Sequence, residues 1–252
     1  MRAQRSNPDL PSSTGLLRRF APRNDEGRRI ETGFRIIAAA LGWFAIITQY
    51  SLMAANAGPH LVERTVNFFS YFTIVSNILV ALALTLPWLA PGSRAGRFFM
   101  LPSVRTAIAA YIIIVAVVYH TMLSRLYHPQ GWRLVCDIIL HYVMPPLFVL
   151  DWALFVDKRD LSWRLTLPSF ALPVVYLMWT ALHGALAGFY PYPFLNVNRI
   201  GYEQSLLNVG GLIVAFVCLI LALVGIGRLF SQGPHPEEHA RSRACVSEDG
   251  QI

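Results

Sequence analysis

Two short stretches of the chain carry the polar side chains best suited to chemistry, and both lie in strongly apolar surroundings. The first reads FFSYFTIVSNILVAL and places four hydroxyl or amide side chains at helical spacing: Ser70, Thr73, Ser76 and Asn77. The second reads CDIILHYVMPPLFVLDW and places Asp137 four residues before His141. Residues three or four apart share one helix face, so each stretch presents its polar groups together.

His141 lies within the apolar segment 134–156, where an ionisable side chain needs a partner or a task. Insertion scales put the cost of the most polar residues at a helix centre at about 2.5–3.5 kcal/mol. Asp137 is placed to reach the imidazole and fix its tautomer. In a regular helix the carbonyl of residue 141 accepts a hydrogen bond from the N–H of residue 145, but Pro145 has no N–H. A kink with unpaired carbonyls is therefore expected there. We therefore expect His141 to belong to a functional site.

Other polar residues have a structural explanation of similar weight. Ser70 and Ser76 are typical of residues that hydrogen-bond a neighbouring helix or their own backbone. His120 and His183 lie in two further apolar segments, and each is explained equally well as a hydrogen-bonded structural histidine. Asp151 is expected to pair with an arginine or a headgroup-level polar group.

Composition identifies the class of protein. The chain has 252 residues, of which 55% are hydrophobic and 14% charged, whereas a soluble domain has about 25% charged residues. A spanning helix needs about 20 apolar residues. Six segments qualify, and they predict an all-α, six-helix transmembrane bundle with proline kinks in the fourth and fifth helices: 33–54, 69–89, 104–124, 134–156, 164–187 and 205–229.

The remaining sequence predicts two tails and an orientation. Residues 1–30 and 231–252 are polar and are expected to be disordered, leaving 31–230 as one transmembrane domain. Of the 21 Lys and Arg residues, 17 fall on the side of the tails, so both termini are expected to be cytoplasmic. The net charge of +7 comes from arginines in tails and loops, which indicates contact with lipid headgroups and not with nucleic acid.

Helix lengths place four polar residues at one depth. At 1.5 Å per residue, Thr73, His120, His141 and His183 fall within roughly 5–11 Å of the outer interface. Three histidines in one layer leave a metal or haem site open as an alternative. A transporter or binding protein, and a scaffold without chemistry, are further alternatives. The chain has no G-x-S-x-G, H-E-x-x-H or Walker A sequence. Our first expectation is that the protein holds neither a metal nor a cofactor.

The two polar stretches, together with YPYPFLNV, resemble a bacterial family of six-span, proline-rich membrane proteins over roughly residues 33–230. A more distant similarity runs to the eukaryotic androgen-induced and androgen-dependent multi-pass proteins. Those are intramembrane threonine hydrolases that cleave fatty-acid esters of hydroxy fatty acids. Their motifs place a threonine after an aromatic-rich helix start and a histidine before a proline in a later helix.

The resemblance implies a function for these residues. Thr73 in YFT would match the nucleophile and His141, before Pro145, its base, with Asp137 as the orienting group. Asn77, or N–H groups of a broken helix, would serve the oxyanion. The remaining pocket candidates are Ser76, His120, His183 and, from the aromatic loop 188–199, Tyr192. The implied partners are membrane lipids, with a lipid-like ester as substrate in the bacterial inner membrane; the oligomeric state stays open.

Overall fold

The computed structural model describes residues 25–159, 161, 163–165 and 167–231. In these ranges every regular element is a helix, and six helices are long and apolar enough to cross a membrane. The expected all-α bundle is thereby confirmed. The expectations for residues 1–24 and 232–252 lie outside the described residues, but the first helix begins at Asp25, inside the expected tail. Asp25 and Glu26 favour this start because acidic side chains stabilise a helix N-terminus.

The spans follow the predicted segments closely. The first two are α2 (Asp25–Ala54) and α4 (Phe72–Leu89), and the third is α6 (Pro102–Val118) with a π-helical segment, Tyr119–Leu123. The fourth joins α7 (Trp132–Ile138), a π-helical segment, Ile139–Val143, and α8 (Met144–Phe155). The fifth is a short 3-10 turn, Leu167–Phe170, with α9 (Ala171–Ala187), and the last is α10 (Val197–Ser231). Two shorter helices are α3 (Leu61–Phe69) and α5 (Arg94–Met100).

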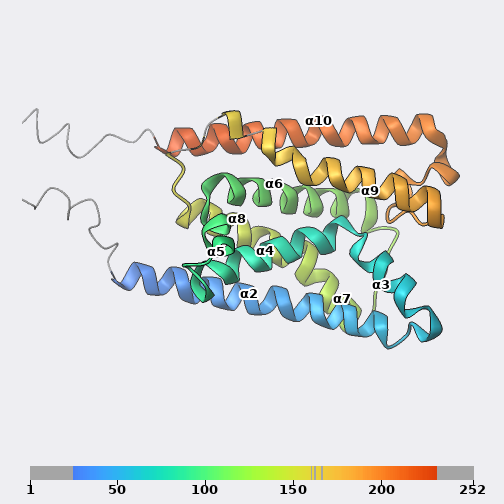
Figure 1. Cartoon of the computed structure of the whole chain (residues 1–252), viewed down its shortest axis with the longest axis horizontal. Helices are drawn as coiled ribbons and strands as arrows, with labels where there is room; N and C mark the ends of the chain where they lie inside the picture. The colour runs from blue at the N-terminus through green and yellow to red at the C-terminus, as the bar shows by residue number, and fades with distance from the viewer. Residues whose placement is uncertain (1–24, 160, 162, 166, 232–252) are drawn as a thin grey trace, which may run out of the picture.

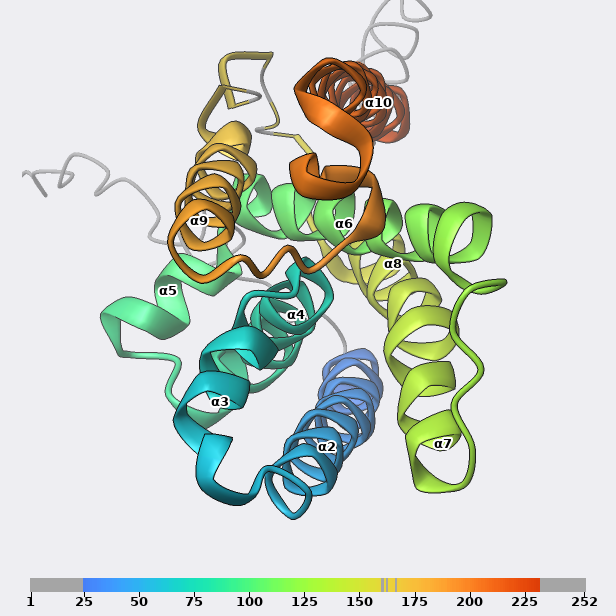
Figure 2. The same ribbon diagram turned by 90° about the vertical axis from the view of Figure 1, so that its right-hand side faces the viewer.

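The beginning of α2 and the end of α10 lie at the same end of the bundle (Figure 1). The opposite end, which holds α3 and α7, faces the viewer in Figure 2. There α4 lies in the middle, packed against α2 and α6, while α10 packs on the outer side of α6. The central position of α4 matters because α4 carries Thr73.

The second span differs from its prediction at its start. The sequence predicted one helix over 69–89, but α3 ends at Phe69 and α4 begins at Phe72. Ser70 therefore closes α3, where its hydroxyl donates to the carbonyl of Val66, and does not share a helix with Thr73. The break gives α4 an N-terminus inside the bundle.

Large apolar side chains cover the outer surface of the spans. Ile37 on α2, Leu186 on α9 and Leu207 on α10 are 73%, 80% and 64% exposed. Extended apolar surface of this kind is rare on soluble monomers and normal for helices that face lipid. The exposed faces and the six long helices together make this a multi-pass membrane protein.

A buried ion-pair network joins three spans near the end where α2 begins. Asp151 on α8 is fully buried and accepts from two arginines, Arg35 Nε at 2.7 Å and the guanidinium of Arg105. Arg105 is 2% exposed and also donates to the carbonyl of Ala83 at 2.9 Å. Both arginines lie near the ends of spans, inside the predicted segments 33–54 and 104–124, and the arginine partner expected for Asp151 is confirmed. Burial explains the pairing, because an unpaired charge in hydrocarbon is costly.

Replacing Asp151 by asparagine is expected to lower the free energy of unfolding by about 3–5 kcal/mol, because it leaves the buried Arg105 without its counter-ion and removes one of the two carboxylates that pair with Arg35. The midpoint of thermal unfolding in detergent measures the loss. Glu63→Gln is a matched control, since that carboxylate is largely exposed on α3. Equal midpoints for Asp151→Asn and Glu63→Gln would show that the network does not stabilise the bundle.

Candidate active site at Thr73 and His141

The first turn of α4 positions Thr73. Tyr71 is the N-cap residue and Thr73 the second helical residue, so the N–H of Thr73 has no partner within its own helix. It donates instead to the phenol oxygen of Tyr192 at 3.2 Å. The positive end of the helix dipole therefore lies beside the Thr73 hydroxyl.

A π-helical segment positions His141. At the end of this segment the N–H of Met144 bonds the carbonyl five residues earlier, that of Ile139. The next residue, Pro145, has no N–H, so the carbonyl of Leu140 is left without a helical donor. The Asn77 side chain fills this gap: its Nδ2 donates to the Leu140 carbonyl at 3.2 Å and to the Thr73 carbonyl at 2.9 Å. One buried amide thus ties the helix of the threonine to the segment of the histidine.

Thr73, His141 and Asp137 form a connected series. His141 Nε2 lies 3.4 Å from Thr73 Oγ1, and its Nδ1 lies 3.2 Å from Asp137 Oδ1 and 3.0 Å from the Asp137 carbonyl. A proton on Nδ1 faces two acceptors of Asp137, which leaves the lone pair of Nε2 directed at the threonine hydroxyl. All three side chains are buried. The arrangement has the order of nucleophile, base and orienting group.

Tyr119 completes the surroundings of the histidine. Its ring stacks on the imidazole of His141, with centroids 3.7 Å apart and planes at 18°. Its hydroxyl donates to Asp137 Oδ2, so both carboxylate oxygens of Asp137 are engaged. The sequence reasoning singled out the neighbouring His120 and missed Tyr119. Tyr119 directly precedes His120 in the third span but, unlike His120, is buried inside the bundle.

Tyr192 reaches the site from the loop between α9 and α10. Its phenol oxygen lies 3.4 Å from Thr73 Oγ1 in addition to its bond with the Thr73 N–H. Burial raises the pKa of the Tyr192 phenol, so the group stays protonated and able to donate. The loop folds back over the end of α9 because Gly184 has no side chain; a Cβ there would meet the ring of Tyr190 at 2.2 Å.

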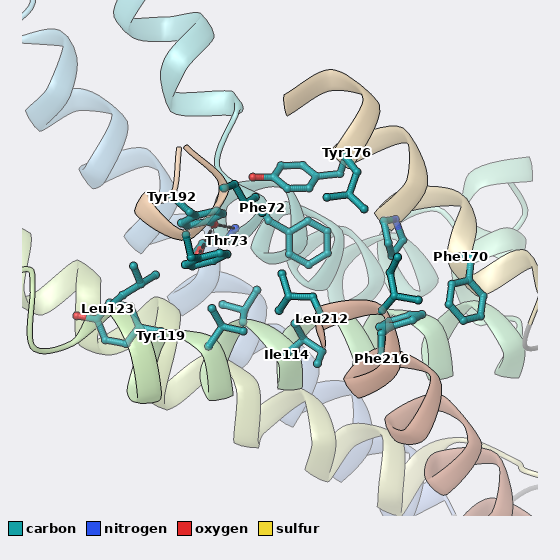
Figure 3. A pocket seen from close by; sticks show the side chains of 17 residues that line it. Phe72, Thr73, Ile114, Tyr119, Leu123, Phe170, Tyr176, Tyr192, Leu212 and Phe216 are labelled. Carbon is teal, nitrogen blue, oxygen red and sulfur yellow. Dashed lines mark hydrogen bonds between the residues drawn. The ribbon is translucent and has the colours of Figure 1, made fainter. Parts of the chain in front are cut away.

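An apolar groove opens at Thr73, and we call it the Thr73 groove. It has a volume of about 750 Å³ counting its open side. Its walls come from α6, α9, α10 and the loop that carries Tyr192, and its polar atoms come from Thr73 and the three tyrosines 119, 176 and 192. Thr73 and Tyr192 lie at one end and Phe170 and Phe216 at the other (Figure 3). His141 is not among the residues that line the groove, but Tyr119, which stacks on it, is.

The other predicted site residues lie apart from this series. His120 is exposed and pairs with the Tyr142 hydroxyl at 3.4 Å, and His183 pairs with Asn67 Oδ1 at 2.9 Å.

Ser76 is buried on α4, and its hydroxyl has no hydrogen-bond partner among the described residues. Both N–H groups of Asn77 are used by carbonyls, which favours a positioning role over contact with an oxyanion. No three His, Cys, Asp or Glu side chains gather as a metal site in the described ranges.

Comparison of the chain with protein-family models, curated proteins and solved structures finds no match. The family resemblance suggested by the sequence therefore stays a prediction. The contacts among Thr73, His141, Asp137 and Tyr192 are the observations from which a function has to be argued.

The bond between Asn77 and the Leu140 carbonyl can be tested with a double-mutant cycle. Asn77→Leu is expected to destabilise the protein by about 1–3 kcal/mol, because it leaves a buried carbonyl unpaired. In a Pro145→Ala background the new N–H can bond that carbonyl, so the same substitution is expected to cost clearly less. Thermal unfolding in detergent measures both differences.

Asn56→Leu is the control for this cycle, since Asn56 bonds only its own helix on the exposed surface. If Asn77→Leu costs the same with proline and with alanine at position 145, the amide does not act by replacing the missing N–H.

Proposed function

We propose that the protein is an intramembrane ester hydrolase in which Thr73 is the nucleophile and His141 the general base. The observation that carries the proposal is the 3.4 Å contact between Thr73 Oγ1 and His141 Nε2, with Asp137 holding the opposite ring nitrogen. A threonine hydroxyl reacts poorly unless an adjacent base removes its proton. The positive end of the α4 dipole beside it favours the developing negative charge. The predicted family resemblance points to the same pair of residues.

The reaction proceeds in two halves. His141 takes the proton of the Thr73 hydroxyl as Oγ1 bonds the ester carbonyl carbon, and the resulting tetrahedral intermediate carries its charge on the carbonyl oxygen. When the ester bond breaks, the departing alkoxide takes the proton from His141, which leaves an acyl-threonine. Water then gives a proton to His141 and its oxygen attacks the acyl carbon; collapse returns the proton to Thr73 and releases the carboxylic acid.

One donor and one fixed dipole lie close to the place where the oxyanion forms. The donor is the phenol of Tyr192, and the dipole is that of α4, because the N–H groups of Thr73 and Ile74 already bond the Tyr192 oxygen and the Tyr71 carbonyl. The Tyr192 proton faces the Thr73 hydroxyl in the free protein and can turn to a substrate oxygen that binds beside it. Donors fixed in place before the reaction stabilise the transition state without reorganisation.

The substrate we propose is a lipid ester taken from the bilayer. The reacting hydroxyl opens into an apolar groove among membrane-spanning helices, where a lipid has easier access than a polar ester. From the family resemblance we propose a bacterial inner membrane, and from the distribution of arginines we propose that both termini are cytoplasmic. The Thr73 end of the bundle would then lie in the outer leaflet.

Thr73→Ala and His141→Ala are each expected to lower hydrolysis of long-chain p-nitrophenyl esters by at least about 100-fold, because each removes one half of the proton transfer. Thr73→Ser should keep part of the activity, since it keeps a hydroxyl. Rates are measured on the purified full-length protein in detergent, with size-exclusion profiles as the test of folding.

Thr121→Ala and His128→Ala are matched controls at exposed positions, and both are expected to retain wild-type rates. Hydrolysis that continues in folded Thr73→Ala and His141→Ala would exclude the pair as the source of activity. A folded wild-type protein that hydrolyses no ester of any chain length would exclude the hydrolase itself and favour the transport and scaffold alternatives.

Tyr192→Phe is expected to lower kcat by about 100-fold with little change in KM, because a donor to the oxyanion acts mainly in the transition state. Steady-state kinetics on the same esters separates the two constants. Tyr202→Phe is the control, as that tyrosine is exposed on α10. A rise in KM with unchanged kcat would instead assign Tyr192 to substrate binding.

A further inference from the structure

We propose that the Thr73 groove holds the acyl chain of the ester, and that the chain enters it sideways from the bilayer between α9 and α10. The proposal rests on the proposed function and adds to it a binding site, a route and a limit on chain length. Phe170 and Phe216, at the far end from Thr73, would determine which chain length fits best.

The lining of the groove fits a hydrocarbon chain. Apart from Thr73 and the tyrosines, every side chain that lines it is apolar. The tyrosine hydroxyls do not make the far end polar, because Phe170 and Phe216 close it with ring centroids 5.0 Å apart. A chain in this groove brings its carboxyl end to the threonine hydroxyl.

The sides of the groove differ in how they are closed. At the Thr73 end, Tyr192, Phe194 and Leu195 are buried and pack against Phe72 and Leu123, so the loop covers this end. Between α9 and α10 the wall is incomplete, because α10 packs on α6 and on the loop and not closely on α9 (Figure 2). Ile213 lines the groove there and is still 45% exposed. The open side therefore faces the surface that meets lipid.

The far end is firmly supported. Phe216 stacks on Tyr111, with centroids 5.8 Å apart and planes at 18°, and the Tyr111 hydroxyl donates to the Ser169 carbonyl at 2.7 Å. Along α9 the lining extends from Phe170 to Leu177, roughly 10 Å at the helical rise. A longer chain has to bend out through the open side, which disfavours long chains relative to medium ones.

The first test compares kcat/KM for p-nitrophenyl octanoate and palmitate. Phe216→Ala removes the far end of the groove and is expected to raise the palmitate-to-octanoate ratio about tenfold, the scale on which apolar pockets separate chain lengths. Phe44→Ala is the matched control on the exposed face of α2 and should leave the ratio unchanged. An unchanged ratio in an active Phe216→Ala protein would overturn the assignment of the far end.

The second test does not depend on hydrolysis. An octanoic acid with a diazirine at its methyl end is photolysed with the full chain in lipid nanodiscs, and the labelled residues are identified by mass spectrometry. We expect saturable labelling near Phe170 and Phe216, competed by octanoic acid and reduced by Ile213→Trp, which fills the open side. Labelling spread only over lipid-facing residues, without competition, would overturn the groove as an acyl site.

The two proposals fail in different ways. Absence of hydrolysis with saturable labelling of the groove would remove the hydrolase and keep the acyl site. Hydrolysis by Thr73 without labelling of the groove, and without a change of ratio in Phe216→Ala, would keep the hydrolase and remove the acyl site.

Discussion

The site depends on one backbone group, the Leu140 carbonyl, which has no helical donor because the residue five positions later is proline. In hydrocarbon an unpaired carbonyl is costly, so a donor has to come from a neighbouring helix. Asn77 supplies it, and the same amide also bonds the Thr73 carbonyl one turn away. The distance between the threonine hydroxyl and the imidazole is therefore fixed by a hydrogen-bonding requirement of the backbone, and not by the two side chains alone.

The two ends of the bundle bury their polar side chains in different arrangements. At the end where α2 begins, Asp151 pairs with two arginines in an ion-pair network. At the other end the polar groups are a hydroxyl, an imidazole, a carboxylate and two phenols, joined by successive contacts. Opposite charges satisfy one another in the first set, whereas Thr73 in the second set lines a groove and is available to a ligand there.

The six spans, their order and the pairing of Asp137 with His141 could be predicted, because hydropathy and i, i+4 spacing are local properties. The break before α4 could not, since the aromatic run from Phe68 to Phe72 stays apolar through it. The rotation of each helix about its own axis could not be predicted either. His120 and His183 were therefore grouped with His141 by depth, although their side chains contact other partners. The role of Asn77 required the π-helical register, in which the carbonyl of Leu140, like that of His141, faces a proline that has no N–H.

The order of the contributing residues along the chain has a consequence for biosynthesis. Thr73 belongs to the second span and His141 to the fourth, while Tyr192 follows the fifth and one wall of the groove is the last helix. Chains are made from the N-terminus, and the earlier spans enter the bilayer first. A partly synthesised chain thus carries the threonine and the histidine without the phenol or the completed groove. The site becomes whole only after α10 has been made.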